Sequence, residues 1–308
     1  MNIKTNEDDG RFERSESGFR NWITPDGSAG PSGTGGFKAE KDRYHLYVSL
    51  ACPWANRTLI MRKLKGLEDM ISISVVNPFI EDEEWTFKDG PGVIADPIFG
   101  AKDILEIYRK SDPDFNGYTS VPILFDKKTN TIVNNESSEI IRMLGEAFDE
   151  LGAKEGNYYP EEFRDEIDTM NDRVYDAVNN GVYKAGFATT QEAYEESVTA
   201  LFEELDRLED HLEGREYLIG DRLTEADIRL FVTLIRFDPV YVGHFKCNLK
   251  EIRQYDNLSA YTRRLYQIPE FKDTINFDHI KEHYYMSHQE INPTRIVPKG
   301  PKMDYLED

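Results

Sequence analysis

Cys52 and Pro53 stand at a junction between two segments of different pattern. Residues 44–49 have the pattern of a β-strand, and residues 53–65 have the pattern of a helix. Proline suits the first position of a helix because its missing N–H group would have no intrahelical partner there. Cys52 is therefore predicted to be the N-cap, where orphan backbone N–H groups and the helix dipole stabilise a thiolate. Because the thiolate is the reactive form of cysteine, the junction indicates sulfur chemistry.

The segments after this junction continue the pattern of a small α/β domain. Residues 71–76 are β-branched and apolar, which predicts a buried strand. A helix, two strands and a helix are then predicted at 103–110, 121–126, 131–133 and 136–148. The order is βαβ followed by αββα, the thioredoxin-like arrangement. Residues 77–102 interrupt it as an irregular loop, and a loop of that length inside a compact domain is usually functional or disordered.

The rest of the chain is predicted to be helical. Leucines at 201, 205, 208 and 212 repeat on one helix face, and Thr224 with Asp227 has the spacing of a capping box. The predicted fold class is an α/β thioredoxin-like N-terminal domain plus an all-α C-terminal domain. In order, an extended N-terminal segment, the α/β domain, the helical domain and a C-terminal tail are predicted at 1–40, 41–150, 161–288 and 289–308.

Composition excludes several classes of function. The chain has 308 residues and a formal net charge of −21, so it should repel nucleic-acid phosphates and anionic lipids. Its two cysteines, Cys52 and Cys247, exclude a disulfide framework and fit a reducing compartment. The first nine residues lack the apolar core of a secretory signal, and no apolar run approaches the ~20 residues that span a bilayer. We expect a cytoplasmic protein that binds neither nucleic acid nor membrane.

Eight motifs along the chain carry a family resemblance. They are Cys52–Ala55, Trp85–Phe87, Val121–Pro122, Asn134–Ser137, Asn179–Ala188, Leu223–Asp227, Arg236–Tyr241 and Asn276–His279. With them the chain resembles the cytosolic glutathione transferases and, within these, the Xi class, the glutathionyl-hydroquinone reductases. The resemblance runs from about residue 20 to about residue 300, and it implies the cytosolic glutathione transferase fold with glutathione as co-substrate.

Cys52 is the catalytic candidate within this resemblance. Ala55 stands where a second cysteine would be needed, so a dithiol cycle within the motif is impossible. A mixed disulfide with an external thiol is the natural intermediate. The alternative is a buried, inert cysteine.

The resemblance places glutathione against several residues of the α/β domain. Pro122 would be a cis-proline that lets the backbone of Val121 pair with an extended peptide; an ordinary edge-strand proline is the alternative. Glu136 suits the ammonium of the γ-glutamyl end, and Ser137 with the helix N–H groups suits its carboxylate, although the pair is also common as a plain helix cap. Trp85 is implied to cover the tripeptide, and an exposed surface aromatic is the alternative.

The resemblance also selects Tyr183, Tyr241 and Tyr284 from the seventeen tyrosines of the chain. Phenol hydroxyls can hydrogen-bond a quinol oxygen while the rings line an aromatic pocket. Tyr183 and Tyr284 are the candidates for the catalytic acid, and Tyr241 is a candidate substrate contact. Without the resemblance, each of the three would be an ordinary structural tyrosine.

Two further patterns give no assignment. Members of the class commonly carry an arginine before the Val-Pro strand, whereas residues 116–120 here are Asn-Gly-Tyr-Thr-Ser, and neither Arg109 nor Lys110 is assigned to the glycyl carboxylate of glutathione. His279 and His283 have the spacing of a zinc pair, but the required His-Glu-x-x-His order is absent. We therefore predict no metal.

The predicted function is the glutathione-dependent reduction of glutathionyl-hydroquinones through a mixed disulfide between Cys52 and glutathione. The resemblance further implies a homodimer. One alternative is an Omega-like thiol transferase or dehydroascorbate reductase, which shares the Cys-Pro pair but lacks the insertion at 77–102. Another is a non-enzymatic, transferase-like binding module, which we would expect to lack the nucleophile.

Overall fold

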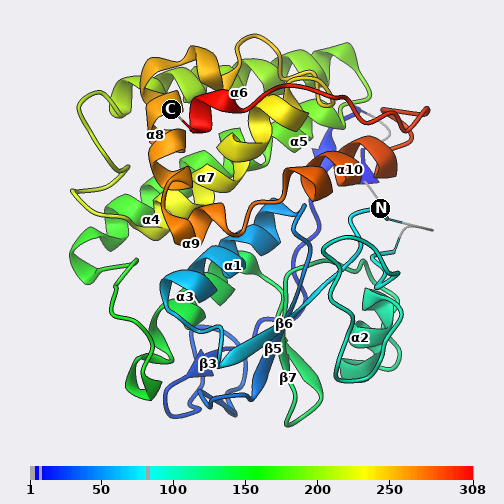
Figure 1. Cartoon of the computed structure of the whole chain (residues 1–308), viewed down its shortest axis with the longest axis vertical. Coiled ribbons are helices and arrows are strands. Elements are labelled where there is room, and N and C mark those ends of the chain that lie inside the picture. Colours follow the sequence, from blue (N-terminus) through cyan, green and yellow to red (C-terminus); the bar gives the residue numbers. More distant parts are fainter. Residues whose placement is uncertain (1–3, 7–8, 81–83, 308) are drawn as a thin grey trace. The chain divides into compact units, whose positions relative to one another are not determined.

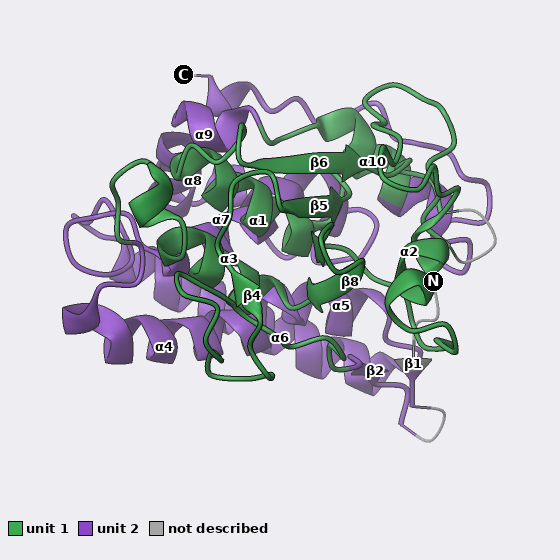
Figure 2. Ribbon diagram, turned by 90° about the horizontal axis from the view of Figure 1, so that it is seen from below, with its two compact units in different colours: residues 1, 16–157, 274–283 green, residues 2–15, 158–273, 284–308 purple. Residues whose placement is uncertain are grey.

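The computed structural model describes residues 4–6, 9–80 and 84–307, so parts of the predicted N-terminal segment and the last residue of the tail lie outside it. The chain divides into two compact units, which Figure 2 shows in different colours. The main part of the first unit consists of residues 16–157 and 274–283. The second contains residues 2–15, 158–273 and 284–308.

A four-stranded mixed sheet forms the centre of the first unit. Its strands are β5 (Tyr44–Val48), β6 (Ile71–Val75), β7 (Ile123–Asp126) and β8 (Thr131–Asn134), in the spatial order β6-β5-β7-β8. Strand β5 pairs in parallel with β6 and antiparallel with β7, so Leu46 lies between Ile73 and Leu124. Every residue of β5 is buried, as expected for a central strand. The predicted thioredoxin-like order is confirmed.

Three helices flank this sheet. They are α1 (Pro53–Leu64), α2 (Ile104–Ser111) and α3 (Ser137–Glu146). Figure 1 shows α1 and α3, which pack against each other, on one side of the sheet and α2 on the other. Asp103 begins α2 by accepting a hydrogen bond from the backbone of Glu106 at 2.9 Å. Gly66 follows α1 with a φ of 61°, a left-handed conformation that glycine adopts without steric cost.

The N-terminal segment is more ordered than its loop-like composition predicts. Two pairs of two-residue strands are present: β1 (Lys4–Thr5) with β2 (Phe12–Glu13), and β3 (Ile23–Thr24) with β4 (Phe37–Lys38). Residues 19–21 run antiparallel to β8, with Asn21 N donating to the Val133 carbonyl at 2.9 Å and Asn135 N donating to the Phe19 carbonyl at 3.1 Å. This segment therefore covers the outer edge of the sheet.

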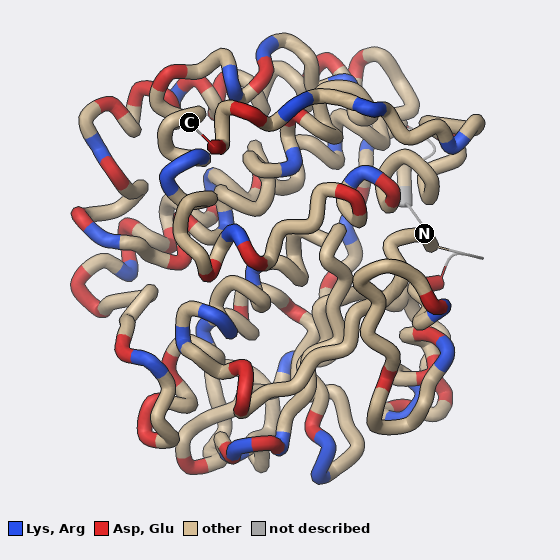
Figure 3. The backbone as a smooth tube through the Cα atoms, in the orientation of Figure 1, with Lys and Arg blue, Asp and Glu red and all other residues tan. Residues whose placement is uncertain are grey.

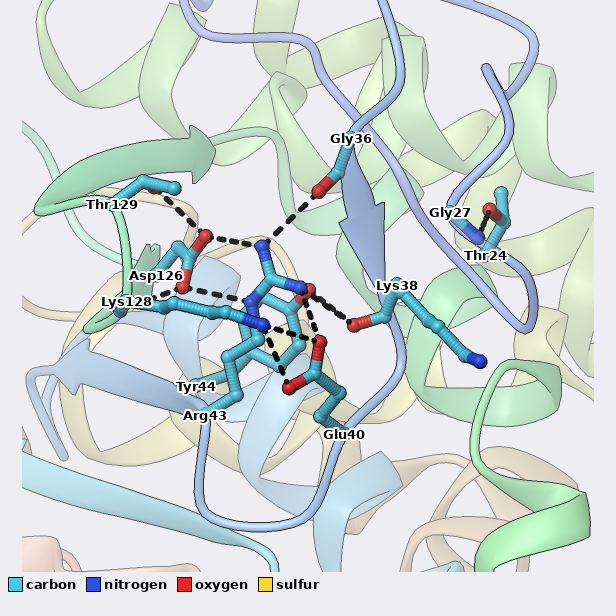
Figure 4. A network of polar contacts seen from close by, with 10 residues as sticks. All are labelled: Thr24, Gly27, Gly36, Lys38, Glu40, Arg43, Tyr44, Asp126, Lys128 and Thr129. Carbon is cyan, nitrogen blue, oxygen red and sulfur yellow. Dashed lines mark hydrogen bonds and ion pairs between the residues drawn. The ribbon is translucent and has the colours of Figure 1, made fainter.

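A buried ion pair fastens residues 36–40 to the sheet (Figure 4). Arg43 Nη2 lies 2.6 Å from Asp126 Oδ2, and the two side chains are 5% and 0% exposed. The same guanidinium donates to the carbonyls of Gly36 and Lys38 and to Glu40. Burial alone would raise the pKa of Asp126, but hydrogen bonds, led by those from Arg43, hold it below its usual value.

The second unit is helical. Its helices are α4 (Arg164–Arg173), α5 (Gly181–Gly186), α6 (Gln191–His211), α7 (Glu225–Arg236), α8 (Asp256–Tyr266) and α9 (Pro269–Lys272), with the C-terminal end of α10 (Phe277–Ser287). The leucines at 201, 205, 208 and 212 are all buried, which confirms the predicted apolar face of α6. The predicted capping box also forms, because Thr224 N donates to Asp227 Oδ2 at 2.8 Å.

Two π-helical turns that the sequence patterns did not predict adjoin these helices. They are η3 (Val174–Asn179), between α4 and α5, and η4 (Phe237–Tyr241), directly after α7. Such turns are rare and are frequent at functional sites. The 3₁₀ turns are η1 (Asp149–Leu151), η2 (Glu161–Phe163), η5 (Ile252–Gln254) and η6 (Asp304–Leu306). The last of them buries Leu306, whose carbonyl accepts a hydrogen bond from Gln267.

Charged residues are spread along the helices and loops of both units (Figure 3). The strands of the central sheet carry few of them. In the described part of the chain, none of the helices combines the length and the apolar character that crossing a membrane requires.

Candidate active site

Cys52 is the N-cap of α1, as predicted. Its backbone is extended, with φ −73° and ψ 121°, and Pro53 occupies the first helical position. The Cys52 carbonyl accepts the first helical hydrogen bond, from Asn56 N at 3.0 Å. The Cys52 side chain is nearly buried, at 9% exposure, and Sγ lies 3.4 Å from the carbonyl oxygen of Val121. The thiol therefore lies between the start of a helix and the segment that precedes β7.

The peptide bond between Val121 and Pro122 is cis, as predicted, and the alternative of an ordinary edge-strand proline is wrong. Val121 is 5% exposed. Because its carbonyl accepts the hydrogen bond from Cys52, the cysteine motif and the Val-Pro motif meet at the sulfur atom.

Glu136 is the N-cap of α3, which begins at Ser137. One carboxylate oxygen, Oε1, accepts hydrogen bonds from the backbone N–H and the hydroxyl of Ser138, both at 3.0 Å. The other, Oε2, lies 3.1 Å from the hydroxyl of Ser17. Burial alone would raise the pKa of Glu136, but the bonds from Ser138, the charge of Arg57 and the bond from Ser17 hold it below its usual value. Glu136 is therefore an anion at neutral pH.

Arg57 is a charged residue of this region that the sequence patterns did not reveal. It lies in the second turn of α1, is 1% exposed, and its Nη1 approaches the Ser137 hydroxyl at 3.4 Å. Its guanidinium carbon lies 4.6 Å from the ring centroid of Trp54. An anion at Glu136 and a cation at Arg57 thus flank Ser137, and together they complement a group that carries both charges.

Trp85 lies in the irregular loop but is only 5% exposed, so its interpretation as an exposed surface aromatic is wrong. Its ring stacks on His283, with centroids 4.7 Å apart and planes 22° apart. His283 in turn contacts the Pro78 carbonyl at 2.9 Å. Since the Trp85 carbonyl also accepts from Ile104 N at 2.9 Å, the described part of the loop is fastened to both α2 and α10.

The loop at 116–120 faces a carboxylate. The Thr119 hydroxyl is shared between the two oxygens of Glu84, at 2.8 and 2.9 Å, and burial raises the pKa of this acid. Arg109 and Lys110 are exposed on α2, and Lys110 Nζ lies 4.9 Å from the ring centroid of Phe99. We assign none of these residues to the glycyl carboxylate.

The three selected tyrosines meet in the second unit. Tyr284 Oη lies 2.6 Å from Tyr183 Oη and 3.0 Å from Tyr241 Oη, so Tyr284 is the centre of a chain of three phenols. Tyr183 lies in α5 just after one π-helical turn, Tyr241 ends the other, and Tyr284 belongs to α10. All three are at most 4% exposed. Burial, followed by the neighbouring Tyr183, raises the pKa of Tyr241 and Tyr284 well above the usual value.

Aromatic and basic groups surround this tyrosine trio. Phe12 stacks on Tyr183, with centroids 6.1 Å apart, and the Arg14 guanidinium carbon lies 4.9 Å from the Tyr183 ring centroid. Phe245 stacks on Tyr241 at 5.5 Å. The trio therefore offers hydroxyl groups inside an aromatic environment, which suits hydrogen bonding to a phenolic ligand.

Three further histidines and the second cysteine have other contacts. His279 Nε2 contacts the Pro91 carbonyl at 2.6 Å, and His244 and His288 contact each other at 3.0 Å. Among the residues that the structure describes, no group of three or more His, Cys, Asp or Glu side chains is arranged to hold a metal ion. Cys247 is fully buried, and burial raises its pKa, so it is a poor nucleophile.

Comparisons with known proteins identify the family. Two family models match: glutathione S-transferase, N-terminal domain, over residues 51–147, and glutathione S-transferase, C-terminal domain, over residues 191–264. Glutathionyl-hydroquinone reductase YqjG of Escherichia coli is 58% identical over 299 residues, which are 97% of this chain and 91% of that protein.

Solved structures agree in fold. The glutathione-bound structure of YqjG superposes with a TM-score of 0.92 at 59% identity, over 93% of this chain and 94% of the other. The glutathione S-transferase Xi of Phanerochaete chrysosporium superposes with a TM-score of 0.93 at 56% identity, over 98% and 96% of the two chains. The chain therefore belongs to the glutathione S-transferases and, within them, to the Xi class of glutathionyl-hydroquinone reductases.

Proposed function

We propose that this protein reduces glutathionyl-hydroquinones to hydroquinones and uses glutathione as the reductant. The observation that carries the proposal is the single thiol of Cys52 at the start of α1, within reach of the Val121 backbone next to a cis-proline. A nucleophile with this setting and without a second cysteine in its motif reacts with an external thiol compound. The relative YqjG carries the name of this activity and binds glutathione in its solved structure.

The first step forms a covalent intermediate. The Cys52 thiolate attacks the sulfur atom of the glutathionyl group, a Cys52–glutathione disulfide forms, and the bond between sulfur and the aromatic carbon breaks. The electron pair of that bond stays on the carbon, which takes up a proton, and the hydroquinone leaves. The aromatic carbon is thereby reduced, and the two sulfur atoms are oxidised to a disulfide.

The second step regenerates the enzyme. The thiolate of a free glutathione attacks the glutathione sulfur of the mixed disulfide, glutathione disulfide leaves, and the Cys52 thiolate returns. The proton lost by this second glutathione balances the proton taken up by the carbon. The net reaction converts one glutathionyl-hydroquinone and one glutathione into one hydroquinone and one glutathione disulfide.

The residues of the first unit have distinct roles in binding the tripeptide. We assign the backbone of Val121, preceding Pro122, to the cysteinyl part of glutathione, where a peptide pairs as an added strand does. Glu136 takes the ammonium of the γ-glutamyl end because it is an anion with an exposed portion. Ser137, with Arg57 behind it, takes the carboxylate at the same end. Trp85 covers the bound tripeptide.

The tyrosine trio has the role of acid and hydrogen-bond donor to the aromatic part of the substrate. Hydrogen bonds join the three hydroxyl groups into one connected group of phenols, and each phenol can both donate and accept a hydrogen bond. We assign Tyr183 and Tyr284 to proton transfer and Tyr241 to contact with the quinol.

Mass spectrometry of the intact protein tests this function. After incubation with a glutathionyl-hydroquinone and no free glutathione, the protein should gain the mass of one glutathionyl group and release one hydroquinone. Cys247→Ser should behave like the wild type, and Cys52→Ser should gain no mass. An unmodified wild-type protein that instead reduces dehydroascorbate would favour the Omega-like alternative.

We further propose that the protein is a homodimer in the cytoplasm, as transferase-like chains commonly pair about a two-fold axis and a glutathione-dependent reductase needs a reducing compartment. Light scattering at micromolar concentration should give twice the mass of the chain. A monomer at that concentration would reject the dimer and leave the chemistry of Cys52 unaffected.

A further inference from the structure

Ser17, in the N-terminal segment, contacts the carboxylate that the proposed function assigns to the ammonium of glutathione. Ser17 Oγ lies 3.1 Å from Glu136 Oε2 and 3.3 Å from the carbonyl oxygen of Asn135. Both of these partners are acceptors, so the single proton of the Ser17 hydroxyl is shared between them, and the contact with Glu136 is the shorter one. The Ser17 side chain is half-buried, which is consistent with a place at the rim of a binding site.

Backbone pairing holds Ser17 in this place. Phe19 N donates to Asn135 Oδ1 at 3.1 Å, and Asn135 N donates to the Phe19 carbonyl at 3.1 Å. Arg20 forms a bridge with Asn134, and its guanidinium forms an ion pair with Glu139. The strand-like segment that begins at Phe19, two residues after Ser17, therefore sets the position of the Ser17 hydroxyl.

The hydrogen bonds of Glu136 leave room for one more donor. A carboxylate offers about four lone-pair positions. Within the described residues, Ser138 takes two positions on Oε1, and Ser17 takes one on Oε2. The remaining position is on Oε2, the same oxygen that Ser17 contacts. The Ser17 hydroxyl and an incoming ammonium group would therefore contact the same carboxylate oxygen.

We infer that Ser17 is a positioning residue for glutathione: it orients Glu136 toward the ammonium of the γ-glutamyl end. The N-terminal segment is therefore part of the amine-recognition site as well as a cover for the sheet edge. This inference rests on the proposed function, because it requires Glu136 to bind the ammonium. It adds a residue more than a hundred positions away in sequence from the helix start at which the ligand binds.

Calorimetric titration with two ligands tests the inference. The first ligand is glutathione, and the second is glutaryl-cysteinyl-glycine, which is glutathione without its α-amino group. All measurements use a Cys52→Ser background so that no chemistry follows binding. Ser17→Ala should raise the Kd for glutathione roughly three- to tenfold, the effect of losing one hydrogen bond, and should leave the Kd for the deaminated ligand within about twofold.

Matched variants separate positioning from folding. Ser17→Thr keeps the hydroxyl and should restore glutathione binding. Ser15→Ala, an exposed serine of the same segment, should leave both Kd values unchanged. An equal loss for both ligands in Ser17→Ala, or no loss for either, would overturn the role of Ser17.

Glu136→Gln separates the role of Ser17 from the proposed role of Glu136 in binding the ammonium. If Glu136 binds the ammonium, this variant should lose most of the preference for glutathione over the deaminated ligand. If Glu136→Gln loses that preference and Ser17→Ala keeps it, only the inference about Ser17 fails. If Glu136→Gln keeps the preference as well, the assignment of the ammonium to Glu136 fails, and the role of Ser17 fails with it.

Discussion

Replacement of Tyr284 by phenylalanine should disturb the tyrosine trio more than replacement of either neighbour. Tyr284 is the central phenol, and its hydroxyl contacts those of both Tyr183 and Tyr241. Tyr284→Phe therefore removes two hydrogen bonds, whereas Tyr241→Phe removes one of these two. All three rings are buried, so a hydroxyl group that loses its hydrogen-bond partner cannot easily replace that partner with water.

The magnitude follows from this count. A net hydrogen bond contributes about 0.5–1.5 kcal/mol to stability, so Tyr284→Phe should lower the free energy of unfolding by about 1–3 kcal/mol. Tyr241→Phe should lower it by about half as much. Thermal unfolding measures the difference, because 1 kcal/mol shifts the Tm of a unit of this size by about 2–4 °C.

Activity gives a second, independent readout. The measured quantity is the rate with glutathionyl-hydroquinone divided by the rate with a small, non-aromatic mixed disulfide of glutathione. If Tyr284 is the proton donor, Tyr284→Phe should lower this quotient on the order of 10²-fold; if it only contacts the quinol, the fall should be up to roughly tenfold. The disulfide reaction should barely change because it uses only Cys52 and the tripeptide site.

Two results would refute this reasoning. If Tyr284→Phe and Tyr241→Phe have equal stability, Tyr284 is not the centre of a hydrogen-bonded chain. If the quotient is unchanged for all three Tyr→Phe variants, the trio is structural and the specificity for aromatic substrates lies elsewhere.

Three further predictions concern the nucleophile and the stability of the fold. Cys52→Ser should lose turnover and keep glutathione binding, because a hydroxyl also fits the N-cap; rate and calorimetric measurements on one preparation check this. Asp126→Asn should lower the free energy of unfolding by about 3 kcal/mol, because the buried Arg43 charge then lacks its main partner. Glu40→Gln, which affects the more exposed partner of the same guanidinium, should have a small effect in the same denaturation assay. Burial lowers the pKa of His45 to about 4 in the folded chain, compared with about 6.5 in the unfolded chain. Between these two values the unfolded chain binds more protons, so the free energy of unfolding falls as the pH falls, by about 2 kcal/mol between pH 7 and pH 5. His45→Gln should abolish that part of the pH dependence, which denaturation at several pH values measures.

Features that depend on neighbouring residues could be predicted from the sequence. The order of strands and helices in the first unit follows from local patterns, and Pro53 placed Cys52 at the N-cap. Thr224 and Asp227 form their capping box because both partners lie within one helical turn. The cis peptide before Pro122 and the choice of three tyrosines came from the family resemblance, since nothing in the local sequence distinguishes them.

Features that depend on distant partners could not be predicted. Composition made the N-terminal segment look like a loop, yet residues 19–21 pair with β8, more than a hundred residues later. No local pattern singles out Arg57, because its burial beside Ser137 depends on how α1 packs against α3. The π-helical turns before Gly181 and after Arg236 each contain an extra residue that no periodicity in the sequence marks.

Because Cys247 is fully buried, Cys52 should be the first thiol of the folded chain to react with a reagent in solution. A water-soluble disulfide reagent that releases a coloured thiolate reacts with a thiol only where the sulfur is accessible. It should therefore label Cys52, which is 9% exposed, before Cys247, which is 0% exposed and should react only after the second unit opens. The fast amplitude then gives the fraction of competent active sites in any preparation. The rate of the slow phase measures how often the helical unit unfolds locally, and it comes from the same reaction trace.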